Sequence, residues 1–368
     1  WRTLYSPVSY GDKNALIPTQ LGNDKIKWES TVQKDLGLDF SFMRGRLGGT
    51  FGYYHKVTDG TLLNMTPAPS SSYSTVVFNI AKIRNQGLEF DIHGDFIRKK
   101  DFRWTGSLNI SRNVSKVLDI NGGPFSDPNN RDAMNLGTSV VKEGEPLGLL
   151  YGRVATGIIK TQAQLEAARE EFSLWTIFDP YLNLGDIAYE YEDGFWKEDV
   201  IGHATPDFFG GYTNTINWNR FTLTALFTFS YGNDLIYQKD VSDSGMSSLA
   251  NRGTRVLNHY SEDNTSSNRP RSMWGTTYML SSLNVYDASY LKLKTLSLSY
   301  NLPESICRKV RIKSASVYGT ATNVFTITSY PGPDPEVSDD PTSVIGGGRD
   351  VSTYPTVKSY TFGIRINF

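Results

Sequence analysis

The sequence lacks a long apolar run and an excess of charge of either sign. No stretch approaches the roughly 20 apolar residues that a membrane-spanning helix needs. Its 37 basic and 38 acidic residues leave a formal net charge of −1. Because a nucleic-acid-binding protein would carry a basic stripe, we expect no nucleic-acid partner. The single cysteine, Cys307, excludes an intramolecular disulfide and argues against a zinc–cysteine site.

Signatures of catalysis are missing as well. The four histidines are scattered without the spacing of metal ligands. The run Gly-Gly-Gly-Arg at 346–349 lacks the Gly-Lys-Ser/Thr ending of a phosphate-binding loop, and no G-x-S-x-G motif occurs. Cys307 has no evident base beside it in the sequence. We therefore expect no catalytic residue, no metal site, no cofactor and no enzymatic activity.

The sequence does contain repeated alternation of apolar and polar residues. From Tyr360 to Phe368 the even positions are Tyr, Phe or Ile, and the odd positions are polar or glycine. Successive side chains of a strand point to opposite faces, so this strand has one apolar face. Similar segments recur at the length of about 9–11 residues that a tilted transmembrane strand needs. We interpret the terminal aromatic residue, Phe368, as the insertion signal typical of outer-membrane barrels.

The pattern predicts about nine strands, preceded by a loop over residues 1–30. The strands cover residues 31–42, 46–57, 84–97, 102–118, 208–217, 220–231, 285–300, 312–328 and 354–368. A slip in the alternation between residues 291 and 298 predicts a β-bulge in the strand over 285–300.

The predicted connections alternate in length. Short ones lie near residues 43–45, 98–101, 218–219 and 301–311, and long ones near 58–83, 119–207, 232–284 and 329–353. Bacterial membrane barrels have short periplasmic turns and longer extracellular loops, so we place the long connections outside the cell. The longest, 119–207, is a loop excursion with one predicted helix over 162–172, for which Thr161 is the N-cap and Gln164 completes a capping box.

We therefore predict an all-β fold, in which residues 1–368 are the C-terminal part of a large antiparallel transmembrane β-barrel. Plugged outer-membrane transporters have about 22 strands, which leaves roughly 13 to be supplied from elsewhere. Half a barrel would expose unpaired backbone at its edges. We expect an N-terminal barrel half and a plug domain upstream of residue 1, in a longer exported precursor.

Several motifs then stand out in order along the chain. They are Lys27-Trp28-Glu29, Ile83-Arg84-Asn85-Gln86-Gly87-Leu88-Glu89, Tyr290-Leu291-Lys292-Leu293-Lys294, Asp334-Pro335-Glu336 and the closing stretch 354–368. Their ordered set resembles the SusC/RagA-like TonB-dependent outer-membrane transporters. The resemblance implies an energised importer of a large nutrient, a glycan or a peptide. It also implies a SusD-like surface lipoprotein as partner, contact with the TonB complex through the upstream part, and outer-membrane lipid around the barrel.

One departure from that family concerns calcium. The family often carries an acidic Asp-x-Asn-Gly-Asp-Gly loop, where this chain has residues 189–194. With Gly194 at position six of a calcium loop, Tyr189 and Tyr191 occupy the first two ligand positions. Val200 stands where the bidentate glutamate belongs. We therefore expect no calcium at this loop.

The sequence offers one set of candidate ligand-binding residues. Tyr260, Arg269, Arg271, Trp274 and Tyr278 lie on one predicted extracellular loop. Aromatic faces with a few polar groups suit a sugar or a peptide, although packing within the loop explains the same residues.

A second set, Asp334, Glu336, Asp339 and Asp340, forms an acidic loop cluster. We interpret this cluster as a solvated face in preference to a cation site.

Two other functions remain open on the sequence alone. A siderophore or vitamin receptor of the TonB-dependent class would keep the barrel and need no lipoprotein lid. A soluble secreted β-rich carbohydrate-binding protein would share the alternation, but it has no reason to place every long loop at one end.

Overall fold

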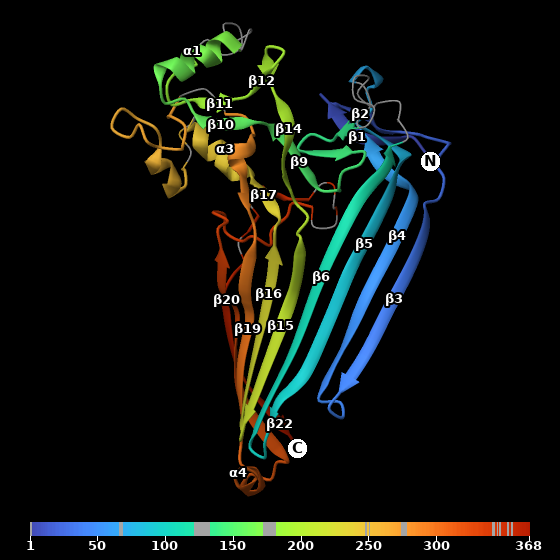
Figure 1. The fold of residues 1–368 in the computed structure, drawn as a ribbon, viewed down its shortest axis with the longest axis vertical. Helices are drawn as coiled ribbons and strands as arrows, with labels where there is room; N and C mark the ends of the chain where they lie inside the picture. Colours follow the sequence, from blue (N-terminus) through green and yellow to red (C-terminus); the bar gives the residue numbers. More distant parts are fainter. Residues whose placement is uncertain are drawn as a thin grey trace.

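A tall antiparallel sheet bearing a group of smaller elements at one end makes up the molecule (Figure 1). The computed structural model describes residues 2–65, 69–120, 133–171, 182–246, 249, 251–273, 278–340, 343, 345, 347–351, 353–354 and 356–368. Among these residues, no helix has the length and apolar character to cross a membrane.

Nine long strands follow one another across the sheet, as predicted from the alternation. They are β3 (Ser30–Phe42), β4 (Leu47–Met65), β5 (Thr75–Arg98), β6 (Phe102–Ile120), β15 (Phe208–Trp218), β16 (Phe221–Tyr231), β19 (Tyr290–Asn301), β20 (Ser314–Thr328) and β22 (Ser359–Asn367). Each pairs antiparallel with the next. The long predicted connections leave one end of the sheet, and the short ones leave the other (Figure 1).

The register keeps like side chains in rows across the strands. One polar row crosses six strands through Thr105, Thr215, Thr224, Ser297, Thr320 and Thr361. The adjacent row on the opposite face runs through Trp104, Ile216, Leu223, Leu298, Gly319 and Phe362. Because the side-chain period of a strand is two, this register gives the whole sheet one polar and one apolar face.

Short turns and one bulge fix that register. Met43, Arg44 and Gly45 all have positive φ and turn the chain from β3 to β4. The predicted bulge is confirmed in β19, where the pairing with β20 shifts between Leu293 and Thr295. Lys294 is the extra residue, and it allows the leucines on both sides of the bulge to share the apolar face.

The N-terminal loop prediction is wrong, because residues 1–30 contain a hairpin. Strands β1 (Leu4–Tyr10) and β2 (Lys13–Leu21) pair antiparallel, and β2 joins β5 through two parallel pairings. Pro7 and Pro18 lie inside these strands. Proline is tolerated in edge strands, but it weakens the sequence signal for a strand.

The predicted loop over 58–83 is also largely strand. β4 continues to Met65 and β5 begins at Thr75, with only the short 3₁₀ turn η1 (Pro69–Ser71) described between them. The β4–β5 register shifts around Thr61, next to Gly60 with its positive φ. These shifts interrupt the alternation, which is why the sequence pattern ends early.

The described residues of the other long connections form small strands and helices. The strands are β7 (Ala133–Asn135), β8 (Ser139–Lys142), β9 (Leu149–Arg153), β10 (Ala155–Ile158), β11 (Ile187–Tyr189), β12 (Tyr191–Glu192), β13 (Phe195–Trp196), β14 (Glu198–His203), β17 (Asp234–Tyr237), β18 (Val285–Asp287) and β21 (Arg349–Asp350). The helices are α1 (Gln162–Glu171), α3 (Gln238–Gly245) and the 3₁₀ turns η2 (Thr254–Asn258) and η3 (Ser282–Asn284). We call the described residues of 133–203, 233–287 and 329–351 the canopy.

The single predicted loop helix is one of three α-helices among the described residues. Helix α1 begins after Thr161 as predicted. Thr161 Oγ1 accepts a hydrogen bond from the backbone N–H of Gln164, and Gln164 Oε1 accepts one from the backbone N–H of Thr161. Phe172, the last residue of the predicted helix, lies outside the described residues. The third helix, α4 (Glu304–Lys309), occupies the predicted turn at the opposite end of the sheet.

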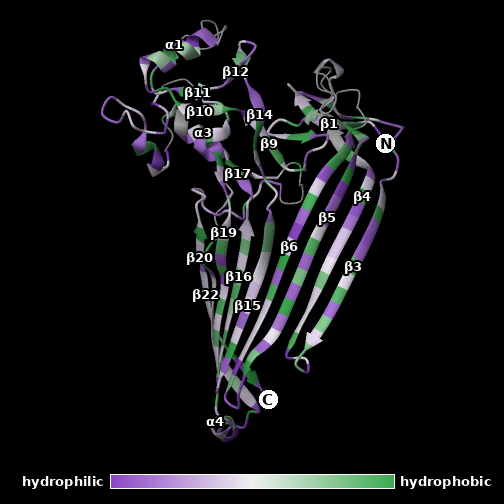
Figure 2. Ribbon diagram, in the orientation of Figure 1, coloured by the Kyte–Doolittle hydropathy of each residue, from purple (hydrophilic) through white to green (hydrophobic). Residues whose placement is uncertain are grey.

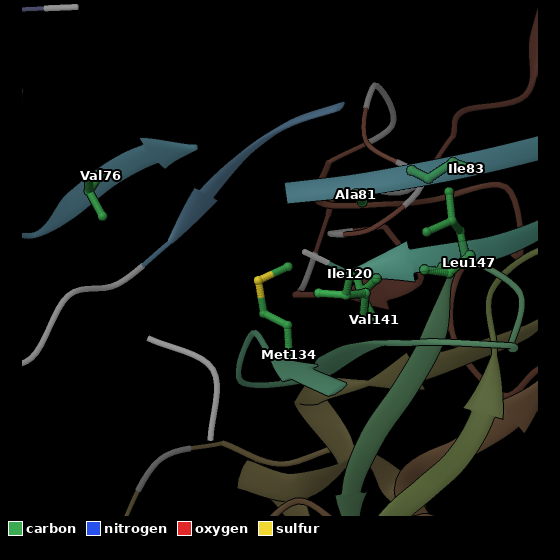
Figure 3. Packing of buried hydrophobic residues seen from close by; sticks show 8 residues of the cluster. Val76, Ala81, Ile83, Ile120, Met134, Val141 and Leu147 are labelled. Atoms are coloured by element: carbon green, nitrogen blue, oxygen red, sulfur yellow. The ribbon is translucent and has the colours of Figure 1, made fainter. Parts of the chain in front are cut away.

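The buried cores lie in the canopy and where β5 and β6 run into it. The largest combines Val76, Ala81 and Ile83 of β5 with Ile120 of β6 and canopy residues, among them Met134 and Val141 (Figure 3). In contrast, the apolar side chains along the middle of the long strands are mostly half-buried or exposed. The canopy is therefore packed as in a water-soluble protein, and the sheet below it is not.

Candidate functional site

The apolar face of the sheet is uncovered. Leu36 and Ile364, on its two outermost strands, are each 69% exposed, and apolar residues recur along the strands between them (Figure 2). The one amide on this face of β15, Asn214, accepts a hydrogen bond from the indole of Trp104. An apolar surface of this extent needs an apolar solvent or a partner.

Aromatic side chains mark both ends of this face. Phe208 stacks on Tyr231 at the canopy end, with ring centroids 5.1 Å apart. Phe221 contacts Trp218 and Tyr300 at the other end, with centroid distances of 6.3 and 4.8 Å. From Phe221 to Tyr231 β16 has 11 residues, the length of a tilted strand that crosses a bilayer. Two aromatic bands at this separation are typical of a transmembrane β-barrel.

The polar face ends at a buried cluster of charges beneath the canopy. Lys292 of β19 is 1% exposed, and its Nζ lies 2.9 Å from Asp334 Oδ1 and 2.6 Å from Glu336 Oε2. Lys294 Nζ and the Tyr290 hydroxyl donate to the other oxygen of Glu336. The cluster fastens the segment after β20 to the rim of the sheet.

Both carboxylates are held in the charged form. Burial alone would raise the pKa of Asp334, but hydrogen bonds from Thr356, the Glu336 amide and Lys292 hold it below its usual value. Burial likewise opposes ionisation of Glu336, and Lys292 outweighs it, so this pKa is lowered too. Removing the lysine would therefore leave two ionised carboxylates without their cation.

The predicted solvated acidic face is wrong for this reason. Asp334 is 2% exposed and bound to Lys292, and Asp339 accepts a hydrogen bond from Arg349. The two motifs that contain Lys292 and Asp334 are 42 residues apart, and the structure brings them into contact.

A cavity of about 580 Å³ opens beside the cluster, on the polar side of the rim. Its lining includes Phe209 and Ser230 from the long strands, Tyr290 and Glu336 from the cluster, and residues 204–206 and 335–348 in part. An aromatic face next to hydroxyl, amide and carboxylate groups can hold a sugar or a peptide segment.

The predicted loop residues gather around a buried aspartate that the sequence did not single out as a ligand. Asp186 is 3% exposed and accepts two hydrogen bonds from Arg271, from Nε at 2.7 Å and from Nη2 at 3.1 Å. The Tyr278 hydroxyl donates to Asp186 Oδ1 at 2.8 Å. Burial and this carboxylate raise the pKa of Tyr278. The structure thus brings Arg271 and Tyr278 together.

The other predicted loop residues lie around them. Tyr260 is half-buried with its ring against Gly185, and its amide donates to the Arg269 carbonyl. The Arg269 side chain turns to a second buried carboxylate, Asp240 of α3. Trp274 lies outside the described residues.

Residues 189–194, the loop compared above with a calcium site, are part of a tight hairpin. β12 and β13 pair across Asp193 and Gly194, which both have positive φ as a type I′ turn requires. Glu190, beside it, is paired with Lys197 Nζ at 2.8 Å. Among the described residues, no group of three or more His, Cys, Asp or Glu is placed to hold a metal ion.

Sequence reasoning missed the buried partners of these sites. Lys292 occupies a regular polar position of an alternating strand, so nothing in the pattern distinguishes it from a solvated residue. Asp186 lies in a connection without periodicity. The motif resemblance drew attention to the segments around Lys292 and Asp334, but contact between them is a tertiary property.

Comparison with known proteins matches the geometry. The family model described as TonB dependent receptor-like, beta-barrel, matches residues 3–225. TonB-dependent receptor P3 of Formosa agariphila is 32% identical over the whole chain, which covers 37% of that protein. TonB-dependent receptor SusC of Bacteroides thetaiotaomicron is 26% identical over 94% of the chain, which covers 32% of it.

Among solved structures, the RagAB peptide transporter superposes with a TM-score of 0.76 at 23% identity. The match covers all of this chain and 38% of that one, and it supports the fold. The chain thus spans about a third of the length of these relatives. The chain therefore belongs to the TonB-dependent receptor-like β-barrel family of the outer membrane, as the family match over residues 3–225, the relatives and the sheet with its two aromatic bands together show.

Proposed function

We propose that this chain is the C-terminal barrel portion of an importer that moves a large nutrient, a glycan or a peptide, across the outer membrane. The observation that carries the proposal is the polar face of the sheet, which leads from the canopy and its rim cavity to the opposite end of the strands. Transport along such a surface needs no bond to be made or broken. The similarity to SusC supports import across the outer membrane, and the solved RagAB structure is that of a peptide transporter.

We propose further that the barrel closes around a plug with strands from an upstream part of the same protein. Within the described residues, β3 pairs only with β4, and β22 only with β20. An unpaired edge inside a bilayer would cost several kcal/mol for each unsatisfied backbone group. About 13 further strands would complete a barrel of about 22 strands. The upstream part would contact the TonB complex.

A SusD-like surface lipoprotein is the proposed partner at the canopy. The segment that carries Tyr260, Arg269, Arg271, Trp274 and Tyr278 is proposed to form the ligand-facing wall. The support is their common segment and the contacts of Arg271 and Tyr278 with Asp186, which hold these two side chains in place. A rigid wall loses less entropy when a ligand binds.

Affinity purification of the receptor from native membranes in mild detergent, followed by mass spectrometry, tests the assembly. We expect a plug-bearing segment and a surface lipoprotein in the same particle. Calorimetry with peptide and oligosaccharide pools then identifies the ligand class. Recovery of a lipoprotein-free receptor that binds only a small iron chelate or vitamin would replace this proposal with the siderophore or vitamin alternative.

A further inference from the structure

A basic surface lies on the outward, lipid-side face of the sheet near the canopy end. Ser111 of β6 pairs with Phe209, which is next to Phe208 of the aromatic band. Arg112 follows Ser111 and points to the outward face. Lys116 is four residues further along the same face. Both positions are therefore beyond the apolar band and at the level of lipid headgroups, if the long connections lie outside the cell as proposed.

Two cations on this face are placed directly opposite each other. Arg84 of β5 pairs with Lys116 of β6 in the strand register, so both side chains project from the same face. Like charges in this position destabilise a sheet, because their Cβ atoms are only about 5 Å apart. The Arg84 Nε is buried and has no hydrogen-bond acceptor among the described residues. An anion between the two side chains would remove both conflicts.

Further positive charge lies near this pair on the same face. Lys34 of β3 pairs with His55 of β4 in the next outward row, and Arg112 lies four residues from Lys116. The outward carboxylates nearest to the pair are Asp59 and Asp119, and both face Lys82, with Asp59 3.6 Å from it.

A groove of about 880 Å³ adjoins the pair on the same face. Val32 and Val57 line it below, and Val57 pairs directly with Arg84. Lys25, Lys27 and Trp28 line it above together with Asp24, and Trp28 is 98% exposed. Asp59 and Lys82, which form an ion pair, also line the groove. Tryptophan and lysine side chains at the end of an apolar band are typical of a membrane–water interface, where they contact both lipid chains and headgroups.

We propose that Arg84, Lys116, Arg112 and Lys34 bind the phosphate groups of an outer-leaflet lipid A, with part of its sugar headgroup in the adjoining groove. The apolar strand positions below would contact its acyl chains. The lipid would neutralise the Arg84–Lys116 pair and hold β3 to β6 in place at the canopy end of the sheet. The inference rests on the outer-membrane placement of the barrel and is independent of the transported ligand.

The test compares outward and inward cations in the membrane-extracted receptor. Its variants are Arg84→Gln/Lys116→Gln, Lys34→Gln and the matched control Lys56→Gln. Lys56 is one residue from His55 on β4 and faces the polar side. The probe is bisphosphorylated lipid A in detergent–phosphatidylcholine micelles, measured by native mass spectrometry, with phosphatase-treated lipid A and inorganic phosphate as comparators.

We expect the double variant to bind lipid A roughly 10- to 30-fold more weakly, because each surface cation contributes about 1 kcal/mol. Lys34→Gln should bind a few-fold more weakly, Lys56→Gln should match the unaltered receptor, and dephosphorylated lipid should bind as weakly as the double variant does. Heat-modifiable gel migration checks that each variant is folded. Three results would overturn the proposal. One is a loss of lipid A binding in Lys56→Gln equal to that of the double variant, and another is undiminished binding by the folded double variant. The third is displacement of lipid A by inorganic phosphate at the same concentration. Since nutrient binding is measured separately, failure here leaves the import proposal standing, and the reverse also holds.

Discussion

At the scale of single residues, Lys292 and Lys294 show how position within one strand decides the energetic role of a charge. Lys292 is buried between Asp334 and Glu336, whereas the side chain of Lys294 is 45% exposed and contacts Glu336 alone. Breaking a buried ion pair by removing one partner typically costs 3–5 kcal/mol, and an exposed pair contributes about 1 kcal/mol or less. The two lysines therefore form a matched pair for mutation.

We predict that Lys292→Met destabilises the docking of residues 329–353 on the rim by roughly 3–5 kcal/mol, because two buried carboxylates lose their cation. Lys294→Met should change this docking by about 1 kcal/mol or less. Limited proteolysis of the detergent-solubilised receptor measures the opening of the segment, since cleavage reports the open population. Equal cleavage rates in the two variants would contradict the role given to the buried cluster.

The same cluster predicts a dependence of docking on pH. The pKa values of Asp334 and Glu336 in the folded state lie below their ordinary values of 3.8 and 4.5. Carboxylates with lowered pKa stabilise the folded state fully above the ordinary values, and this contribution is lost as the pH falls through the lowered ones. We expect pepsin to cleave 329–353 slowly near pH 5 and increasingly fast below about pH 3.8. The Asp334→Asn/Glu336→Gln variant should lack that increase after correction for the enzyme's own pH profile.

At the scale of elements, the long strands could be predicted from the sequence and the canopy could not. Alternation over nine or more residues is a strong signal, and even the bulge at Lys294 is visible as a slip between Leu293 and Leu296. The canopy strands have two to six residues, too few for a period to emerge. Contacts such as Arg271 with Asp186 join residues 85 apart, which no local pattern encodes.

The two faces of β22 allow a direct test of the strand assignment. Phe362 lies over Gly319 on the apolar face, and Thr361 pairs with Thr320 on the polar face. A lysine on the lipid side of a barrel costs about 2–4 kcal/mol near the bilayer midplane, and one on the lumen side does not meet lipid. We predict that Phe362→Lys reduces the amount of assembled, heat-modifiable receptor several-fold and that Thr361→Lys leaves it nearly unchanged. The opposite ranking would mean that the faces are reversed.

At the scale of the whole molecule, two parts are stabilised by different solvents. The sheet exposes its apolar residues and depends on lipid, while the canopy buries its own and depends on packing and charge pairs around Asp186 and Asp240. Damage confined to the charge pairs around Asp186, away from the core that β5 and β6 share with the canopy, should therefore leave the sheet folded. This separation allows ligand binding to be disturbed without loss of the barrel.

We predict that Arg271→Met leaves assembly in the outer membrane unchanged, because the described contacts of its guanidinium hold it to Asp186 and Met273 within the canopy. The variant should open the canopy to protease, since Asp186 keeps only the Tyr278 hydroxyl as a side-chain partner from that segment. Binding of the nutrient identified by calorimetry should fall at least about tenfold, the equivalent of 1.4 kcal/mol. Arg308→Met is the control, because Arg308 forms an exposed pair with Glu304 on α4, at the end of the sheet away from the canopy. If Arg271→Met prevented assembly, the canopy would have to fold before the barrel closes. If the variant left both protease resistance and ligand binding intact, the wall proposed around Asp186 would not be the surface that the ligand contacts.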